Sequence, residues 1–538
     1  MRLTAVSSLV LIGIAAAGAP CLSQEPLDAR RLQALEERAF FRTIEEQGGC
    51  SHDSGDRPEL GPVLLDPAPS FAPQILRVGI TPSSFDAAGN LVSEYLTSAA
   101  HNHTVVETTG TGFFDLLDPA TGALLAVGWP GQGLAFARAS LGGPIAITLK
   151  GVSLGSHPGP LRVRAADDSL LVVNSIRRLN RLLPPIGGVY QYTPAPYHGE
   201  LAVYASEADP AKLRLANLVD IENYVPGVVV NESLGSFHRE ALRAQAITAR
   251  GYALANIGRF NSRGFDIDDS TSSQVYRGQS SETAVALDAA KSTSGLVITR
   301  NDRLVSALYS SSMGGHTESN EYVFPVGGYP GTNPDPALRG IHDSADPLAV
   351  DLSTDAGVYT FYTTVYPGSS EVSPVTGNPL TSLHRWTRTR TAAELLSRLK
   401  ESFGVPSSAA VIDDIQITLR GASGRMMRAA IDGDWGQTTV SGWSDLRRLA
   451  TLSGVTPGGT AATSAPNSPS TFVITRDGAN RVASLVFYGG GFGHNVGMSQ
   501  YGAQGRALRG QTAEQILQSY YSGVTVGPVP SFGSTDAR

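Results

Sequence analysis

Short apolar runs separated by turn residues dominate the chain from about residue 74 to residue 210. The runs are ILRVGI, ALLAVGW, IAITLKGV, LRVRA and SLLVVN. Apolar runs of this length between Gly, Pro and Asp are typical of strands, so we predict a β-rich accessory region over residues 74–196. Upstream, the apolar positions of residues 27–47 have helical spacing, which predicts a helix, and a linker rich in Pro and Asp completes residues 24–73.

The pattern changes at Leu213. The segment LRLANLVDIENYVPGVVV predicts a strand, a turn and a second strand, and it leads directly to Glu232. A helix is then predicted from His238 to about Ile257, capped by Ser236. Its apolar positions fall on one face: Leu242, Ala246, Ala249 and Ala253.

A second well-marked helix is predicted near the C-terminus. Thr512 and Gln515 form a capping-box pattern, and Gly523 marks the end of the segment. Together these patterns predict an α+β fold, in which the β-rich region is followed by mixed α/β structure and a tail occupies residues 528–538.

The first residues predict export. Arg2 precedes an apolar stretch that is shorter than the roughly 20 residues of a membrane-spanning helix, and small residues follow it. We therefore predict a signal peptide over residues 1–23, no integral membrane segment after its removal, and a location in the periplasm, the cell wall or outside the cell. Lipid attachment at Cys21 is the alternative to cleavage after Ser23.

Composition narrows the choice of partners. The chain has 538 residues, 41% of them hydrophobic, which excludes both a multi-span membrane protein and a disordered chain. Asp and Glu outnumber Lys and Arg by 48 to 41, so there is no cationic excess for a nucleic acid. The two Cys residues cannot form a disulfide scaffold.

Glu232 is the first candidate for chemistry. It lies between an apolar run and a helix that carries Arg239, Arg243 and Arg250. A carboxyl group half-buried by apolar neighbours has its neutral form favoured, as a general acid near neutral pH requires. The alternative is a Glu that stabilises the positive end of the helix dipole.

Three further segments concentrate polar residues and glycine. FDIDDSTSSQVYRG, residues 265–278, could bind sugar hydroxyls, or it could be an ordinary polar connection. In residues 309–318, Ser311 or Ser312 could act as a nucleophile with His316 as its base. In the Gly-rich segment 489–502, His494 could be a ligand, an acid–base group or a core imidazole.

Two weaker motifs favour ordinary structure. The letters Gly151 to Gly155 match a hydrolase nucleophile elbow, but SHPGP follows where that motif requires a helix. His101 and His103 have no spaced carboxylate or Cys partner for a metal, so we predict a surface loop there.

Six segments occur in a fixed order: NYVPGVVVNE, EALRAQAITARGYAL, STSSQVYRG, YSSSMGGHTES, GFGHNVGMSQYGAQGRAL and ILQSYYSGV. In this order they resemble the sporulation stage II protein D family, also called the amidase-enhancer LytB family, over about residues 197–527. The resemblance implies that these residues form a mixed α/β catalytic core with a substrate groove. The resemblance implies a lytic transglycosylase that cuts peptidoglycan glycan strands between N-acetylmuramic acid and N-acetylglucosamine without water. It also implies that strands stripped of stem peptides are the preferred substrate and that no cofactor is needed.

The same resemblance suggests roles for individual residues. The family's catalytic acid corresponds to Glu232, and Arg250 corresponds to a position near it, where it would orient the carboxylate or bind glycan. Residues expected to line the groove are Gln274, Tyr276, Ser311, Ser312, His494, Ser499, Gln500 and Tyr501. Some relatives hold zinc with His and Cys in the third segment, but only His316 is present there, so we expect no metal. Asn495 stands where Gly is typical, which would stiffen the loop or narrow the groove.

Three hypotheses follow. The first is the transglycosylase, with Glu232 acting twice as acid and base. The second is a non-catalytic peptidoglycan-binding protein that stimulates a cell-wall amidase, for which Glu232 is dispensable. The third is a secreted serine hydrolase that uses Ser311 and His316.

Overall fold

The computed structural model of the chain describes residues 74–94, 101–455 and 464–529. The predicted signal peptide, N-terminal helix and linker lie outside these residues, as does nearly all of the predicted tail. The described part contains both helices and several sheets, which confirms the α+β class. None of the described helices combines the length and the apolar character that crossing a membrane requires.

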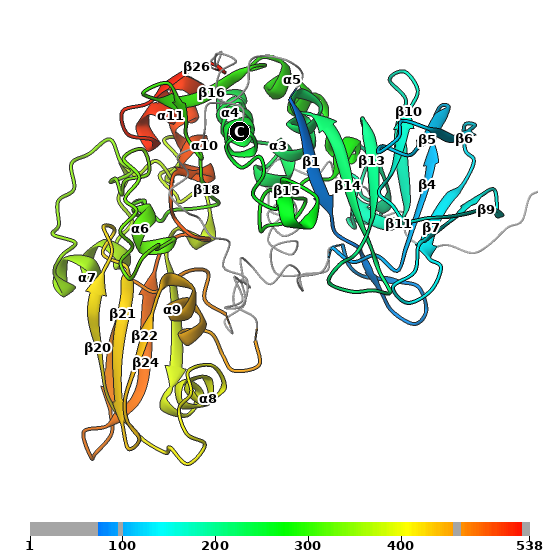
Figure 1. Cartoon of the computed structure of the whole chain (residues 1–538). Helices are drawn as coiled ribbons and strands as arrows, with labels where there is room; N and C mark the ends of the chain where they lie inside the picture. Colours follow the sequence, from blue (N-terminus) through cyan, green and yellow to red (C-terminus); the bar gives the residue numbers. More distant parts are fainter. Residues whose placement is uncertain (1–73, 95–100, 456–463, 530–538) are drawn as a thin grey trace, which may run out of the picture.

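Two sheets, antiparallel except for the pair β1 and β15, form the N-terminal region on one side of the molecule (Figure 1). The seven-stranded sheet has the order β15 (Ile267–Asp268), β1 (Ile75–Ile80), β14 (Leu213–Asp220), β13 (Glu200–Ala205), β10 (Leu161–Ala165), β5 (Phe114–Leu117) and β6 (Leu124–Gly128). The six-stranded sheet has the order β12 (Tyr192–Tyr197), β11 (Leu171–Leu179), β4 (Val105–Gly110), β7 (Leu134–Arg138), β8 (Ile145–Leu149) and β9 (Val152–His157). A small hairpin joins β2 (Ser84–Phe85) to β3 (Leu91–Ser93).

The seven-stranded sheet combines strands from both sides of residue 196. β13 pairs with β10, and β14 pairs with β1, both antiparallel. The short β15 pairs in parallel with β1 at its other edge. Alternate residues of these strands, such as Leu76 and Val78, enter one hydrophobic core that continues into the central helices.

Helices fill the centre and top of the molecule in Figure 1. They are α2 (Ile221–Tyr224), α3 (Pro226–Glu232), α4 (Arg239–Ala255), α5 (Ala284–Lys291), α10 (Gln500–Leu508) and α11 (Ala513–Tyr520). Beside them lie the sheet β17 (Arg303–Leu304), β16 (Leu296–Arg300) and β26 (Thr525–Pro528), and the parallel pair β18 (Tyr309–Ser310) and β25 (Met498–Ser499). The helix α6 (Asn320–Val323) and the helix α7 (Asp355–Thr363) follow β18 along the chain.

A third region, which we call the C-terminal lobe, has a hydrophobic core of its own around Leu399, Ile431 and Phe487. It contains two three-stranded sheets and two helices: β19 (Trp386–Thr391), β24 (Val482–Gly489) and β23 (Thr471–Arg476); β20 (Ile412–Arg420), β21 (Met426–Gly433) and β22 (Gly436–Ser441); α8 (Ala392–Ser402) and α9 (Trp443–Leu449). Figure 1 shows this lobe away from the two N-terminal sheets.

Both predicted helices of the described region are present, and only the N-cap of the first differs from the prediction. α4 is confirmed, but its N-cap is His238, whose side chain accepts from the amide of Glu240, and not Ser236. α11 is confirmed with the capping box of Thr512 and Gln515.

The predicted strand over VPGVVV is wrong, because these residues begin α3. Pro226 stands at the start of the helix, where its missing N–H costs nothing, and burial of Val228, Val229 and Val230 outweighs their preference for strands.

Candidate active site

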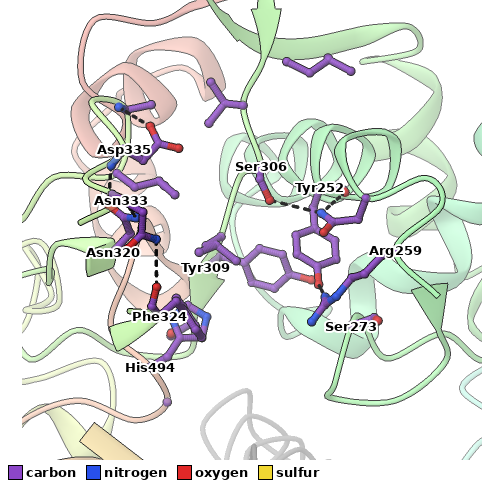
Figure 2. Close-up of a pocket in the computed structure, with 18 of the residues that line it drawn as sticks. Tyr252, Arg259, Ser273, Ser306, Tyr309, Asn320, Phe324, Asn333, Asp335 and His494 are labelled. Carbon is purple, nitrogen blue, oxygen red and sulfur yellow. Dashed lines mark hydrogen bonds between the residues drawn. The ribbon is translucent and has the colours of Figure 1, made fainter. Parts of the chain in front are cut away.

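A cavity of about 880 Å³ lies where the central helices meet the loops around α6 and the Gly-rich segment. Its wall is formed by residue 232, by α4 and the residues just after it, and by parts of segments 271–273, 300–311, 320–338 and 492–500. Figure 2 shows Tyr309 in the middle, with Tyr252 and Arg259 on one side and Asn320, Phe324 and His494 on the other. The volume lies within the range of about 300–1,000 Å³ that is usual for ligand sites.

Glu232 is the last residue of α3 and reaches the cavity wall. Its Oε1 accepts a hydrogen bond of 2.5 Å from the amide of Val275. Removal from bulk water raises the pKa of Glu232 from 4.5 to about 7. The amide of Val275, the positive charge of Arg277 and the donors from Gln500 and Tyr309 limit that rise. Near neutral pH, the Glu232 side chain is therefore present in both its protonated and its ionised form.

A chain of hydrogen bonds fixes which way Tyr309 faces. The hydroxyl of Tyr224 donates to Oε1 of Gln274 over 3.1 Å, and Nε2 of Gln274 donates to the hydroxyl oxygen of Tyr309 over 2.9 Å. Because the Tyr309 oxygen already accepts this bond, its own proton is available to donate to Glu232, whose side chain it contacts. Gln274 thus acts on Glu232 through Tyr309.

A second amide reaches Glu232 from the Gly-rich segment. Gln500, at the start of α10, contacts the Glu232 carboxyl group and donates to Oε1 of Gln245 over 3.4 Å. Ser499 caps α10 by accepting from the amide of Gly502. The cap therefore sets the position of Gln500 at the cavity wall.

The loops around the cavity converge on a buried carboxylate, Glu371, which sequence reasoning missed. Its oxygens accept from Ser312 Oγ over 2.7 Å, Ser499 Oγ over 2.6 Å, His384 Nδ1 over 2.8 Å and the amides of Met313 and Gly314. Burial alone would raise the pKa of Glu371, but these donors outweigh it and hold the pKa well below 4.5. Glu371 has no motif around it, so its neighbours could not be found from the sequence.

Asn495 explains how the Gly-rich segment tolerates a side chain where glycine is expected. Its φ of 66° lies in the left-handed region, which Asn adopts more easily than most residues. The side chain donates to the carbonyl of Ser312 over 2.9 Å and accepts from Asn467 over 2.8 Å. The residue therefore ties two loops together, in line with the expected stiffening.

The predicted groove residues separate into two groups. Ser311, His494 and Gln500 line the cavity with Glu232. The other predicted residues are buried around the cavity without lining it: Gln274, Tyr276, Ser312, Ser499 and Tyr501. Tyr276 donates to Asn217 over 3.0 Å, and Tyr501 packs edge-on against Phe237. Burial places this second group in the support of the site, and their expected role in glycan binding stays a prediction.

Arg250 lies elsewhere than predicted. Its guanidinium group is fully buried and forms two hydrogen bonds of 2.8 Å with Glu222, and it also donates to the carbonyls of Ala290 and Leu296. The structure brings Arg250 to Glu222 and not to Glu232, because its face of α4 points toward α5 and β16. The structure therefore contradicts the predicted contact of Arg250 with the Glu232 carboxyl group.

The arrangement does not support the serine hydrolase. Ser312 donates to Glu371, and Nδ1 of His316 is bonded to the carbonyl of Thr317.

The elbow motif at residues 151–155 lies mostly in strand β9. His101 and His103 are buried, not on a surface loop, and Nε2 of His103 is bonded to the carbonyl of Ile80. Within residues 74–94, 101–455 and 464–529, no cluster of three His, Cys, Asp or Glu residues is placed to hold a metal.

Buried ion pairs connect the N-terminal sheets to the loop that holds Glu232. Arg178 of β11 binds Asp269 over 2.7 Å, and both side chains are fully buried. Arg277 binds Glu94 over 2.5 Å and also contacts Asn231, the neighbour of Glu232. The loop between Asp269 and Arg277 contains Gln274 and Val275, so its position depends on the N-terminal region.

Fold and site together define an α+β protein in which Glu232, a carboxyl group of raised pKa, lies at the wall of a cavity of about 880 Å³. Residues 210–300 match the family described as Stage II sporulation protein, and residues 336–497 match a domain of unknown function, DUF8618. The chain thus carries a domain of the SpoIID/LytB family.

Two relatives from Bacillus subtilis (strain 168) share this similarity. The chain is 29% identical to Amidase enhancer over 307 residues, which cover 56% of this chain and 40% of that relative. It is 26% identical to Stage II sporulation protein D over 329 residues, which cover 58% of this chain and 76% of that relative. The chain thus matches less than half of the length of the first relative.

Proposed function

We propose that this protein is an exported lytic transglycosylase that cleaves the bond between N-acetylmuramic acid and N-acetylglucosamine in peptidoglycan glycan strands. The observation that carries the proposal is Glu232, a carboxyl group at a cavity wall with a pKa of about 7. A protein of the SpoIID/LytB family is expected to act at the cell wall, and the cavity is large enough for more than one sugar ring.

The chemistry requires one carboxyl group to act twice. Protonated Glu232 donates its proton to the glycosidic oxygen as the bond from that oxygen to C1 of the muramic acid breaks. The carboxylate then accepts the proton of the 6-hydroxyl of the same sugar as its oxygen bonds to C1, which gives a 1,6-anhydro end. No water is consumed and Glu232 is again protonated.

The contacts of Glu232 suit both halves of this cycle. The amide of Val275 and the side chains of Tyr309 and Gln500 stabilise the carboxylate after proton donation. Burial keeps that carboxylate basic enough to take a proton back. Hydrolysis of glycosides usually needs a second carboxyl group at a defined distance. Among the described residues of the cavity wall, the second carboxyl group is that of Asp335, and it accepts a hydrogen bond from the amide of Ala337.

Mass spectrometry of the products tests the proposal. Wild-type protein is expected to release fragments with anhydro-muramic ends, lighter by one water than hydrolytic fragments. Glu232→Gln should lower the rate by about 10²–10⁴-fold, the usual share of general acid–base catalysis. Glu207→Gln, an exposed change in the N-terminal region, is the matched control and should leave the rate unchanged. Products with reducing ends, or equal rates for Glu232→Gln and wild type, would contradict the proposal.

A second candidate rests on the similarity to Amidase enhancer. In that function the protein binds glycan and raises the rate of a cell-wall amidase, and Glu232 is not needed. Stimulation of an amidase by Glu232→Gln as strong as that by wild type, with no anhydro product from either, would favour it.

A further inference from the structure

Two side chains of the β-rich accessory region reach the residues next to Glu232. Glu94 directly follows β3, and Arg181 follows β11. The carboxylate of Glu94, 2% exposed, forms an ion pair with the guanidinium group of Arg277, 1% exposed. Nε of Arg181 donates to Oδ1 of Asn231, the residue before Glu232, over 3.0 Å. The accessory region therefore contacts the site through buried polar groups, and not only through its sheet.

The pair of Glu94 and Arg277 has a fixed geometry. Nε of Arg277 donates to Oε1 of Glu94 over 2.5 Å, and Nη2 donates to Oε2 over 2.9 Å. The amide of Leu179 in β11 donates to the same Oε1 over 2.8 Å. Two parallel bonds to one carboxylate set the direction of a guanidinium group. Its remaining terminal nitrogen, Nη1, is thereby aimed at Oδ1 of Asn231, to which it donates.

Asn231 transmits this geometry to the end of α3. Its Nδ2 donates to the carbonyl of Gly227 over 2.7 Å and to Oγ of Ser281 over 2.8 Å. Its Oδ1 accepts from the two guanidinium groups just described. Both donors and the acceptor of this buried amide are thus in use. Because Glu232 is the next residue and ends α3, the direction of its side chain depends on these bonds.

Arg277 also acts on Glu232 through its charge. The positive charge of Arg277 lowers the pKa of Glu232 and so opposes the effect of burial. Charges interact strongly where little water screens them. The carboxylate of Glu94 lies against the same guanidinium group and offsets its field at Glu232. With this compensation the pKa of Glu232 stays at about 7.

The phenols around Glu232 do not take over this role. Burial raises the pKa values of Tyr224 and Tyr309 well above 10, and that of Tyr252 is also raised, so all three are neutral at pH 7. Among the described groups with the largest effects on the pKa of Glu232, Arg277 is the charged one. The remaining charged groups around the site are those of the cavity wall, Arg259, Arg300, Arg303 and Asp335, and the contact of Asp268 with His101.

We propose that the β-rich accessory region is a working part of the site, in which Glu94 is a positioning residue that controls the charge state and direction of Glu232 through Arg277. The role of this control in catalysis rests on the proposed function. A module that only bound the cell wall would need no buried contact with the catalytic acid. The inference therefore gives residues 74–196 a function that their strands alone do not suggest.

The full chain carrying Glu94→Gln tests the charge. This change keeps the shape of the side chain, but the charge of Arg277 then acts on Glu232 without compensation. The pKa of Glu232 should fall by about one unit. NMR titration of ¹³C-labelled Glu carboxyl groups, assigned with Glu232→Gln, measures the fall. The rate of anhydro-end formation should drop about tenfold at pH 8 and stay within about twofold at pH 5. Glu200→Gln, which removes the partner of Arg164 in the same region, should change neither.

A double variant reverses the direction of the shift. Glu94→Leu with Arg277→Met replaces the buried ion pair by apolar side chains, a change that folded proteins commonly tolerate. Because the cation is lost, the pKa of Glu232 should rise, whereas Glu94→Gln lowers it. Loss of packing alone would not give opposite shifts in the two variants. Thermal unfolding checks that each variant is folded, and if Glu94→Gln does not fold, the double variant decides.

The outcomes distinguish this inference from the proposed function. An unchanged Glu232 titration in folded Glu94→Gln would overturn the inference, and so would a rate that falls by the same factor at every pH. An unchanged or lower pKa in the double variant would overturn it as well. If wild type forms no anhydro ends but the titration shifts as expected, the transglycosylase fails and the control by Glu94 stands. If wild type forms anhydro ends and the titration does not shift, the transglycosylase stands alone.

Discussion

Glu232 and Glu371 are both enclosed carboxyl groups of the central region, and their surroundings move their pKa values in opposite directions. Glu232 is partly exposed to the cavity, and its strongest donor is one backbone amide. Glu371 is fully buried, but two hydroxyls, two amides and an imidazole donate to it.

The difference shows that burial alone does not decide the charge of a carboxyl group. Desolvation raises the pKa of both residues, and the number of donors determines whether that effect prevails. Glu371 is a permanent anion that holds the loops of Ser312 and Ser499 together. Glu232 has fewer donors, so it can gain and lose a proton near neutral pH, as the proposed reaction requires.

Removing the Glu371 carboxylate should have the largest effect on stability. Glu371→Ala leaves five donors without an acceptor in a buried site, so we expect the free energy of unfolding to fall by about 3–5 kcal/mol. Urea denaturation measures this change. Glu371→Gln keeps the shape and should lose less. A loss below about 1 kcal/mol for Glu371→Ala would show that the cluster does not hold these loops.

The pH dependence of stability should expose the raised pKa of Glu232. The folded state holds the Glu232 proton more tightly than the unfolded state, whose pKa is near 4.5, so stability decreases as pH rises from 4.5 to about 7. The decrease should reach up to about 3 kcal/mol. Glu232→Gln has no such proton and should become more stable than wild type across this interval, as measured by denaturation at several pH values. A constant difference between the two proteins would contradict the shift.

Removing the Tyr309 hydroxyl, one of the donors to Glu232, should have a smaller effect than the two changes above. Tyr309→Phe removes a hydrogen bond that lowers the pKa of Glu232, so that pKa should rise further, by about one unit. Because the protonated form starts the reaction, the alkaline limb of the pH–rate profile should move to higher pH. Tyr252→Phe removes a neighbouring phenol of the same cavity wall and is the control, which should leave the limb in place. An unchanged limb for Tyr309→Phe would mean that the phenol does not act on Glu232.

Local patterns in the sequence predicted the elements whose signals are local. α4 has an apolar face and α11 has its capping box, and both form as predicted. The apolar neighbours of Glu232 made it a candidate, but they left the helix-dipole alternative open, and only the family resemblance favoured the acid. The valines of α3 misled the prediction, since their preference for strands is overruled by packing against residues far away in the sequence.

Contacts between distant segments could not be predicted. Glu371 meets its donors across 59 residues to Ser312 and 128 residues to Ser499. Arg250 faces Glu222 because α4 and α5 pack against each other, which no spacing within α4 reveals. The roles of Gln274 and Ser499 as supports of the site depend on the same long-range packing.

The seven-stranded sheet limits how this protein could be rearranged by recombination. The segment that matches the sporulation family includes β14 and β15, but β1, which pairs with both, comes from residues 75–80. A fragment beginning at residue 197 would expose an open sheet edge and would lose the partners of Asp269 and Arg277. An exchange of the N-terminal strands would therefore have to preserve their pairing with β14 and their ion pairs with Asp269 and Arg277. The two parts of the chain are thus expected to be inherited together.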